Sequence, residues 1–111
     1  MRLTRPLYQS IRITLFTRAN CGLCDSAKSV LSNLQTSRPF AYREVDIIKP
    51  EAQAWRDLYD FDVPVIHISK ISAPEEDPKL SSKAAKLMHR FTEEEVAAKM
   101  NTVEQTSTRL E

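Results

Sequence analysis

Glycine is the residue that this sequence lacks most, because Gly22 is the only one in 111 residues. Cysteine is nearly as scarce, with Cys21 and Cys24 as the only two. Two cysteines are too few for the disulfide framework of a small secreted protein, so we expect a reducing compartment. All three scarce residues stand together in the stretch Cys21-Gly22-Leu23-Cys24, which makes this stretch the first candidate for chemistry.

Net charge and long apolar runs are also missing. The 16 basic and 15 acidic residues leave a formal charge of +1, which gives no signal for a nucleic-acid partner. Hydrophobic residues make up 41% of the chain, but no run is long enough to span a membrane. We find no internal repeat and no linker. The chain is therefore predicted to be one soluble domain that binds neither nucleic acid nor membrane.

The beginning of the chain is basic, since no acidic residue precedes Asp25 while four arginines do, starting with Arg2. An arginine-rich and acid-poor start is typical of a mitochondrial transit peptide. The first expected strand begins at residue 11, which leaves only about ten residues for such a peptide. We interpret residues 1–10 as a basic tail and expect a cytoplasmic protein, with mitochondria as the alternative.

The two cysteines lie where an expected strand meets an expected helix. Residues 11–17 are short, β-branched and aromatic, which is typical of a buried strand. After them an apolar stripe recurs at helical spacing, formed by Leu23, Ala27, Val30, Leu31 and Leu34. Cys21 is therefore predicted to stand at the start of a helix.

A helix start favours an anion, because its first N–H groups are unpaired and carry the positive end of the dipole. Arg18, three residues earlier, adds a positive charge nearby. Both effects should lower the thiol pKa of Cys21 from its free value of about 8.5. Cys24 lies at the edge of the apolar stripe, whereas Cys21 points away from the centre of the stripe. We therefore interpret Cys21 as an exposed attacking thiol and Cys24 as a sheltered resolving thiol.

Three other interpretations compete with redox chemistry. A structural disulfide between residues so close together would constrain the unfolded chain little. Structural zinc usually needs four Cys or His ligands, and only His67 and His89 could complete such a set. Two inert buried cysteines would not explain the strand-to-helix setting. A Cys-x-x-Cys near a βαβ pattern favours a thioredoxin-like redox site.

The rest of the chain continues the alternation of strands and helices. A proline at residue 39 ends the first helix, and we predict a strand over 40–47 that pairs in parallel with the first. A second helix should begin near Pro50, with Trp55 in the core. A third strand is predicted over 61–68, with Pro64 at its beginning.

The last third of the chain begins with a polar stretch, residues 70–86, predicted to be a long surface loop with a helical turn after Ser81. We expect its acidic run, residues 75–77, to be solvated, and we interpret the loop as an ornament rather than a lid. An antiparallel strand is predicted over 86–91. Thr92 and Glu95 form a capping-box pattern that starts the last helix.

This order of elements resembles the thioredoxin fold in its glutaredoxin-like form. The resemblance covers residues 11–104 and is carried by "ITLFTRANCGLCDSAK", "FDVPVIHI" and "LMHRFTEEEV". The sequence is most similar to the little-characterised glutaredoxin-like proteins of fungi and animals. The resemblance implies an α/β fold with a four-stranded mixed sheet flanked by three helices, and residues 105–111 would form a polar tail.

The family resemblance also implies roles for particular residues. Cys21 would attack a disulfide and Cys24 would resolve the mixed disulfide. Pro64 would be a cis-proline facing the cysteines, and Val63 would offer its backbone to a peptide or to glutathione. Arg18 occupies the place of a lysine that helps glutaredoxins to bind glutathione. Further candidate contacts to substrate are Gly22 and Leu23, between the cysteines, and His89 and Arg90, near the end of the fourth strand.

The sequence departs from glutaredoxins before the last helix, where these proteins carry a Gly-Gly turn and an acid. A chain with one glycine cannot contain that pair, and residues 88–92 stand in its place. Only Glu93 or Glu94 could replace the acid. His67, in the third strand, is predicted to be a half-buried packing residue.

We expect a glutaredoxin-like thiol–disulfide oxidoreductase that acts as a monomer without a bound cofactor or metal. Its partner would be a disulfide-containing protein or glutathione as co-substrate. One alternative is a binding module with little turnover that docks a partner at Val63 and Pro64. Another is a dimer that holds a metal or a cluster through Cys21 of each chain.

Overall fold

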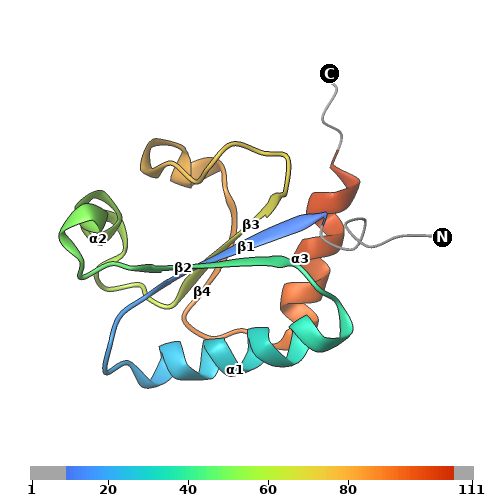
Figure 1. Ribbon diagram of the computed structural model, residues 1–111, viewed down its shortest axis with the longest axis horizontal. Coiled ribbons are helices and arrows are strands. Elements are labelled where there is room, and N and C mark those ends of the chain that lie inside the picture. Colours follow the sequence, from blue (N-terminus) through green and yellow to red (C-terminus); the bar gives the residue numbers. More distant parts are fainter. Residues whose placement is uncertain (1–9, 107–111) are drawn as a thin grey trace.

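The computed structural model describes residues 10–106, so most of the two expected tails lies outside the described residues. The elements in chain order are β1 (Ile11–Thr17), α1 (Gly22–Ser37), β2 (Ala41–Asp46), the short 3₁₀ helix η2 (Pro50–Ala52), α2 (Gln53–Tyr59), β3 (Val65–Lys70), the 3₁₀ helix η3 (Pro78–Lys83), β4 (Ala85–Met88) and α3 (Glu93–Gln105). Figure 1 shows the sheet in the middle of the molecule, with helices around it.

The four strands form one mixed sheet in the order β2-β1-β3-β4. β1 pairs in parallel with β2, as predicted for a strand–helix–strand unit, and antiparallel with β3. β4 pairs antiparallel with β3. This mixed four-stranded sheet with three α-helices confirms the predicted fold class.

Side chains of β1 and β3 alternate between the two faces of the sheet. One face packs against α1 and α3, and its core contains Ile13, Leu15, Leu31, Ile66 and Val96. The other face packs against α2, and its core contains Phe16, Ile47, Tyr59 and Val65, with Trp55 against it. The predicted core position of Trp55 is therefore confirmed.

Two predicted strand boundaries were wrong by three or four residues, and the other differences are one or two residues. The third strand begins at Val65 rather than residue 61, because the preceding residues form a turn closed by Asp62 N–H donating to Tyr59 C=O at 2.9 Å. The fourth strand ends at Met88, since His89 takes a left-handed backbone with φ of 66°. The last helix begins where predicted, with the Thr92 and Glu95 capping box fully formed.

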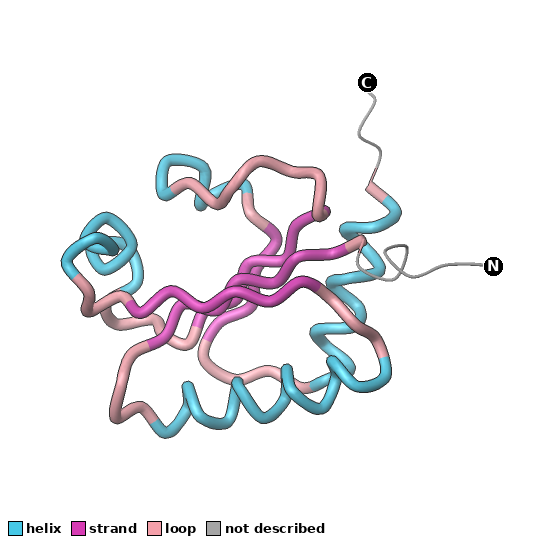
Figure 2. The backbone as a smooth tube through the Cα atoms, viewed as in Figure 1, coloured by secondary structure: helices cyan, strands magenta, loops and turns pink. Residues whose placement is uncertain are grey.

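Residues 71–84, which connect β3 to β4 and which we call the strap, lie over the face of the sheet that also packs against α2. In Figure 2 the strap is the pink and cyan segment above the magenta strands. Its helical turn, η3, starts at Pro78 rather than after Ser81, because the Asp77 side chain caps it by accepting from Lys79 N–H.

Glu76 holds the strap to the sheet. Its carboxylate accepts hydrogen bonds from Arg12 (2.7 Å), Ser69 (2.7 Å) and His67 Nδ1 (2.8 Å). Arg12 also donates to two strap carbonyls, those of residues 73 and 74. The prediction of a solvated acidic run was therefore wrong for Glu76, while Glu75 and Asp77 are exposed as predicted. The interpretation of the loop as an ornament was also wrong, because a strand that buries an arginine needs an acid beside it.

His67 is also more deeply placed than predicted. Only 1% of it is exposed, rather than half, and its Nε2 lies 2.8 Å from the Tyr59 hydroxyl. Since Nδ1 donates to the carboxylate of Glu76, the imidazole links the strap to α2. With both ring nitrogens engaged in this way, His67 holds the strap and α2 in place against the sheet.

Candidate redox site

Cys21 is the N-cap residue of α1. Its backbone is extended, with φ of −126°, and its Sγ accepts a hydrogen bond from Cys24 N–H at 3.1 Å. This contact aims one of the unpaired N–H groups of the helix start at the sulfur, as the sequence predicted. A thiolate at Cys21 would receive the same hydrogen bond, strengthened by its charge.

The two cysteines differ in burial as predicted. Cys21 is partly exposed, whereas Cys24 is completely buried. Their sulfurs form a disulfide across a Cα–Cα distance of 5.2 Å. Cys21 therefore lies partly at the surface, while Cys24 is enclosed by the protein.

Gly22 has open space beside it. A Cβ atom at this position would meet no heavy atom within 4 Å, and its φ is not positive. Neither crowding nor backbone conformation therefore requires glycine between the two cysteines. What glycine does leave is a bare surface next to Cys21. The left-handed residue of this junction is instead Asn20, with φ of 59°, and asparagine is one of the residue types that tolerate this conformation.

The turn before β3 follows Asp60, which hydrogen bonds join to Arg18 in the segment before Cys21. The Val63–Pro64 peptide bond is cis, as the family resemblance implied. The Pro64 carbonyl accepts from the backbone N–H of His89 at 2.8 Å, so this turn is fixed to the end of β4.

Arg18 is paired with an acid that the sequence analysis did not predict. Its guanidinium donates to the backbone carbonyl of Asp60 at 3.0 Å and to the Asp60 carboxylate at 2.8 Å. The two side chains are 28% and 32% exposed, so the pair lies at the surface. Arg18 thus connects the segment before Cys21 to the turn before Pro64. The carboxylate of Asp60 partly neutralises the positive charge of Arg18.

Leu23, His89 and Arg90 come together at one hollow of about 200 Å³. Ser26, Ala27 and Phe91 complete its lining. Leu23 lies between the two cysteines in the sequence, and neither cysteine lines this hollow. His89 and Arg90 thus share a hollow with Leu23, and their role at the site stays a prediction.

His89 has a left-handed backbone, with φ of 66°, within the segment that stands in place of the Gly-Gly turn of glutaredoxins. A left-handed conformation costs a residue with a Cβ about 1–2 kcal/mol. We expect His89→Gly to be at least as stable as the wild type and about 1 kcal/mol more stable than His89→Ala, because only glycine adopts this φ without strain. Urea unfolding of the two variants measures the difference. Equal stability of the two variants would contradict the assigned backbone.

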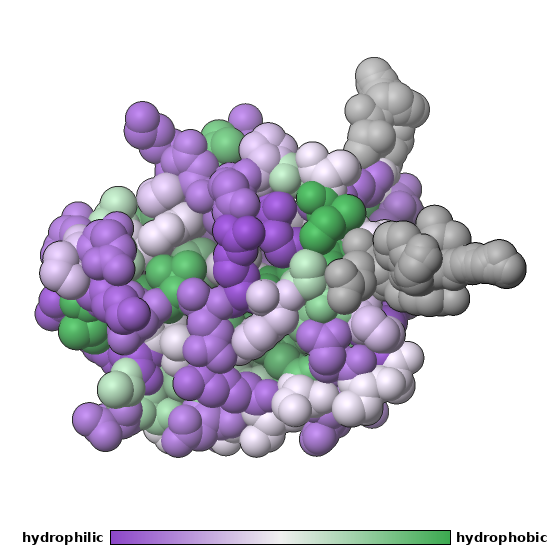
Figure 3. All heavy atoms as spheres, viewed as in Figure 1, coloured by the Kyte–Doolittle hydropathy of each residue, from purple (hydrophilic) through white to green (hydrophobic). Residues whose placement is uncertain are grey.

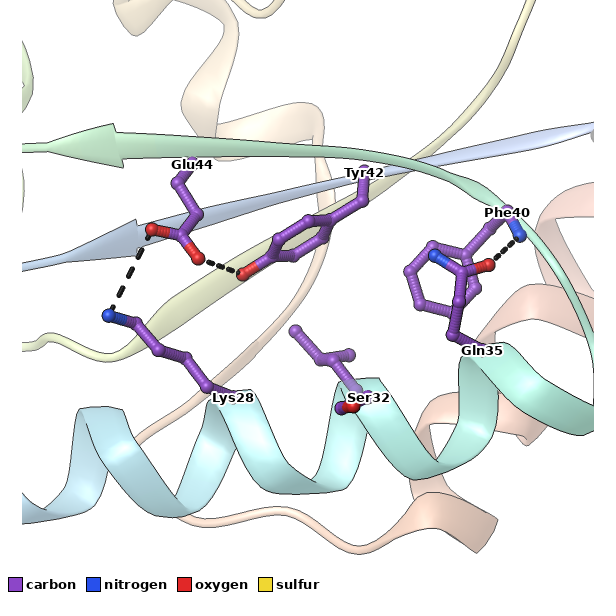
Figure 4. A pocket seen from close by; sticks show the side chains of 7 residues that line it. Lys28, Ser32, Gln35, Phe40, Tyr42 and Glu44 are labelled. Carbon is purple, nitrogen blue, oxygen red and sulfur yellow. Dashed lines mark hydrogen bonds and ion pairs between the residues drawn. The ribbon is translucent and has the colours of Figure 1, made fainter.

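A second hollow, of about 320 Å³, lies between α1 and the edge strand β2. Figure 4 shows Tyr42 and Glu44 of β2 facing Lys28 and Ser32 of α1 across it. The Tyr42 hydroxyl donates to Glu44 at 2.6 Å. Partial burial, with the hydrogen bond and charge of Glu44, raises the pKa of Tyr42, so the phenol stays protonated. Neither cysteine lines this hollow, and the sequence analysis did not predict it.

Neither a metal centre nor a membrane segment is found within residues 10–106. No group of three or more His, Cys, Asp or Glu side chains there is placed to hold a metal ion. No helix in that range has the length and apolar character that crossing a bilayer requires. On the face drawn in Figure 3, hydrophobic residues form small separate patches among hydrophilic ones.

Comparison with known proteins places this site in a family. A curated relative, the Glutaredoxin-like protein YDR286C homolog of Dictyostelium discoideum, is 38% identical over 63 residues. The match covers 52% of this chain and 57% of that protein, so it spans little more than half of the relative's length.

Solved structures show the same fold at low identity. A structural-genomics target protein from X. campestris has a TM-score of 0.57 and 24% identity, over 81% of this chain and 96% of that one. Thioredoxin O2 from Arabidopsis thaliana, in its oxidized state, has a TM-score of 0.58 and 18% identity, over 86% and 76% of the two chains. The fold is therefore the thioredoxin fold. The model of the glutaredoxin-like domain family (DUF836) matches residues 12–101, so the chain belongs to that family.

Proposed function

We propose that this protein is a thiol–disulfide oxidoreductase that uses Cys21 and Cys24 to reduce or exchange disulfides. One observation carries the proposal: a partly exposed Cys21 caps α1 and accepts a hydrogen bond from Cys24 N–H, while the sulfur bonded to it is fully buried. A structural disulfide needs no such difference between its two sulfurs.

The reaction begins with both cysteines reduced. The Cys21 thiolate attacks one sulfur of a substrate disulfide, so that a mixed disulfide forms and the other substrate sulfur leaves as a thiolate that takes up a proton. Cys24 then loses its proton and attacks Cys21 Sγ, which releases the second substrate thiol. The substrate gains two electrons and two protons, and the protein ends with the Cys21–Cys24 disulfide. A thiol such as glutathione returns it to the reduced state.

The helix start supports the first step. The N–H of Cys24 and the dipole of α1 stabilise negative charge on Cys21 when it attacks. In the second step Cys21 Sγ is the sulfur that Cys24 attacks, and the substrate sulfur leaves with the negative charge. Cys24, without solvent around it, reacts only with the neighbour that it touches.

The co-substrate that we propose is glutathione, or a disulfide-containing protein. Support comes from the hollow beside Leu23, where Arg90 offers a guanidinium to a carboxylate. Since His89 supplies the left-handed turn in place of glycine, the backbone there does not rule out a glutathione contact. We further propose a monomer that works without a bound cofactor or metal in the reducing cytoplasm.

The proposal is tested with the fully reduced protein and the aromatic disulfide 5,5′-dithiobis(2-nitrobenzoate). We expect each protein molecule to release two aromatic thiolates rapidly and to lose two hydrogens in mass, because Cys24 resolves the adduct on Cys21. Excess glutathione should reverse the mass change. A stable aromatic adduct, or a mass that glutathione does not restore, would contradict the proposal and favour a binding module with little turnover.

A further inference from the structure

Phe61 is the most exposed large hydrophobic side chain among residues 10–106. It is 91% exposed, whereas the next, Leu80, is 52% exposed. A single apolar side chain at the surface is ordinary in itself. What makes Phe61 unusual is its place, two residues before Val63 in the turn that leads to Pro64.

Backbone hydrogen bonds fix the turn at the residues before and after Phe61. Asp60 N–H donates to Arg56 C=O and Asp62 N–H donates to Tyr59 C=O, both at 2.9 Å. The carboxylate of Asp60 is held by Arg18 at 2.8 Å. The backbone of Phe61 is therefore anchored while its ring meets only solvent, so little conformational entropy would be lost when a partner covers the ring.

The same turn is connected to two segments near the cysteines in the structure, one before Cys21 and one at the end of β4. Arg18, which binds Asp60, is three residues before Cys21. Asp62 Oδ1 lies 3.9 Å from Nε2 of His89, which lines the hollow next to Leu23. From these two connections we infer that a disulfide bound at Cys21 places its flanking residues near Phe61.

The chemistry of the ring selects between the two classes of co-substrate. Glutathione is a γ-glutamyl-cysteinyl-glycine and has no apolar side chain with which to cover a phenyl ring. A protein segment with a bulky apolar residue beside its cystine would bury the ring and gain the hydrophobic free energy of that contact. One exposed, anchored aromatic side chain is typical of a residue that dominates an interface.

We propose that Phe61 is a specificity residue that selects protein disulfides flanked by apolar side chains over glutathione disulfide. This inference rests on the proposed redox function. Phe61 takes no part in the thiol chemistry itself, so it should act on the choice of substrate alone.

The test compares two synthetic disulfide-linked peptide dimers, one of Leu-Cys-Leu and one of Gly-Cys-Gly, both with blocked ends. We expect the wild-type chain to reduce the leucine peptide with a kcat/KM about tenfold higher than the glycine peptide. In Phe61→Ser this ratio should fall to about one. Leu80→Ser is the matched control, since Leu80 is an exposed side chain on the strap, and it should keep the wild-type ratio.

A small disulfide, bis(2-hydroxyethyl) disulfide, shows whether the cysteines are intact, and all three proteins should reduce it equally fast. An unchanged peptide ratio in Phe61→Ser would overturn the inference while leaving the redox function in place. An equal loss on all substrates would overturn it as well. A wild-type chain that reduces none of the disulfides would overturn both proposals. A wild-type dimer that Phe61→Ser dissociates would assign the ring to a second copy of the chain and overturn the inference.

Discussion

Replacing Glu76 with glutamine is expected to lower the free energy of unfolding by about 3 kcal/mol, as is typical when one partner of a buried ion pair is removed. Glutamine keeps the shape of the side chain but loses the charge. Arg12, which is 5% exposed, would then be a buried cation without its acid. For a domain of this size the midpoint of thermal unfolding should fall by roughly 10–20 °C.

The neighbouring acid supplies the control. Glu75 pairs with Arg43 at the surface, where the two side chains are 66% and 50% exposed. Surface pairs contribute little, so Glu75→Gln should change the stability by less than about 1 kcal/mol. Thermal and urea unfolding of the two single variants give the comparison. If both cost the same, the strap is not held to the sheet through Glu76.

The pH dependence of stability should carry the same signature. Burial by itself would raise the pKa of Glu76, but the hydrogen bonds from His67, Ser69 and Arg12 outweigh it and lower the pKa from 4.5 to about 2. A carboxyl group with a lowered folded pKa stabilises the fold fully above its unfolded value and loses that contribution as the pH falls through the folded one. The stability difference between wild type and Glu76→Gln should therefore shrink between pH 4.5 and about 2.

Replacing Cys21 with serine is expected to lower the rate of disulfide reduction at least about a thousandfold, because a hydroxyl has almost no anionic form at neutral pH with which to attack sulfur. The fold should survive, since the N-cap contact to Cys24 N–H can be made by a serine oxygen, which is a preferred N-cap group. Circular dichroism and urea unfolding of the reduced proteins check this.

Cys24→Ser is the matched variant and should fail differently. It keeps the exposed sulfur that attacks, so one substrate thiol should leave at nearly the wild-type rate. The reaction should then stop at a mixed disulfide on Cys21, because the buried partner that resolves it is gone. Mass spectrometry of the two variants distinguishes the roles. If Cys21→Ser formed the adduct and Cys24→Ser did not, the two roles would be reversed.

Local patterns were sufficient to predict much of the fold. The strand over residues 11–17 and the helix after it follow from apolar spacing, and the Thr92 and Glu95 box marks a helix start that depends on four adjacent residues. The places of the two cysteines follow from the same spacing, because the angle between them around a helix decides which sulfur is exposed.

Contacts between distant residues could not be predicted. Nothing in the sequence says which of three adjacent acids meets Arg12, 64 residues away, although a buried strand that contains an arginine signals that some acid must. The Arg18 pair with Asp60 depends likewise on where α2 ends. The sequence analysis compared the segment around His89 with glutaredoxins by residue type alone. In the structure, the hydrogen bond from His89 N–H to Pro64 C=O holds this non-glycine residue in the left-handed conformation.

The pH dependence of alkylation by iodoacetamide, followed on each cysteine of the reduced protein by peptide mass spectrometry, tests the central claim most directly. A sulfur stabilised as an anion at the start of α1 should make Cys21 react with a midpoint well below the free thiol value of about 8.5, while Cys24 reacts only when the protein unfolds. A midpoint for Cys21 at or above that value, or equal reactivity of both cysteines in the folded protein, would contradict it.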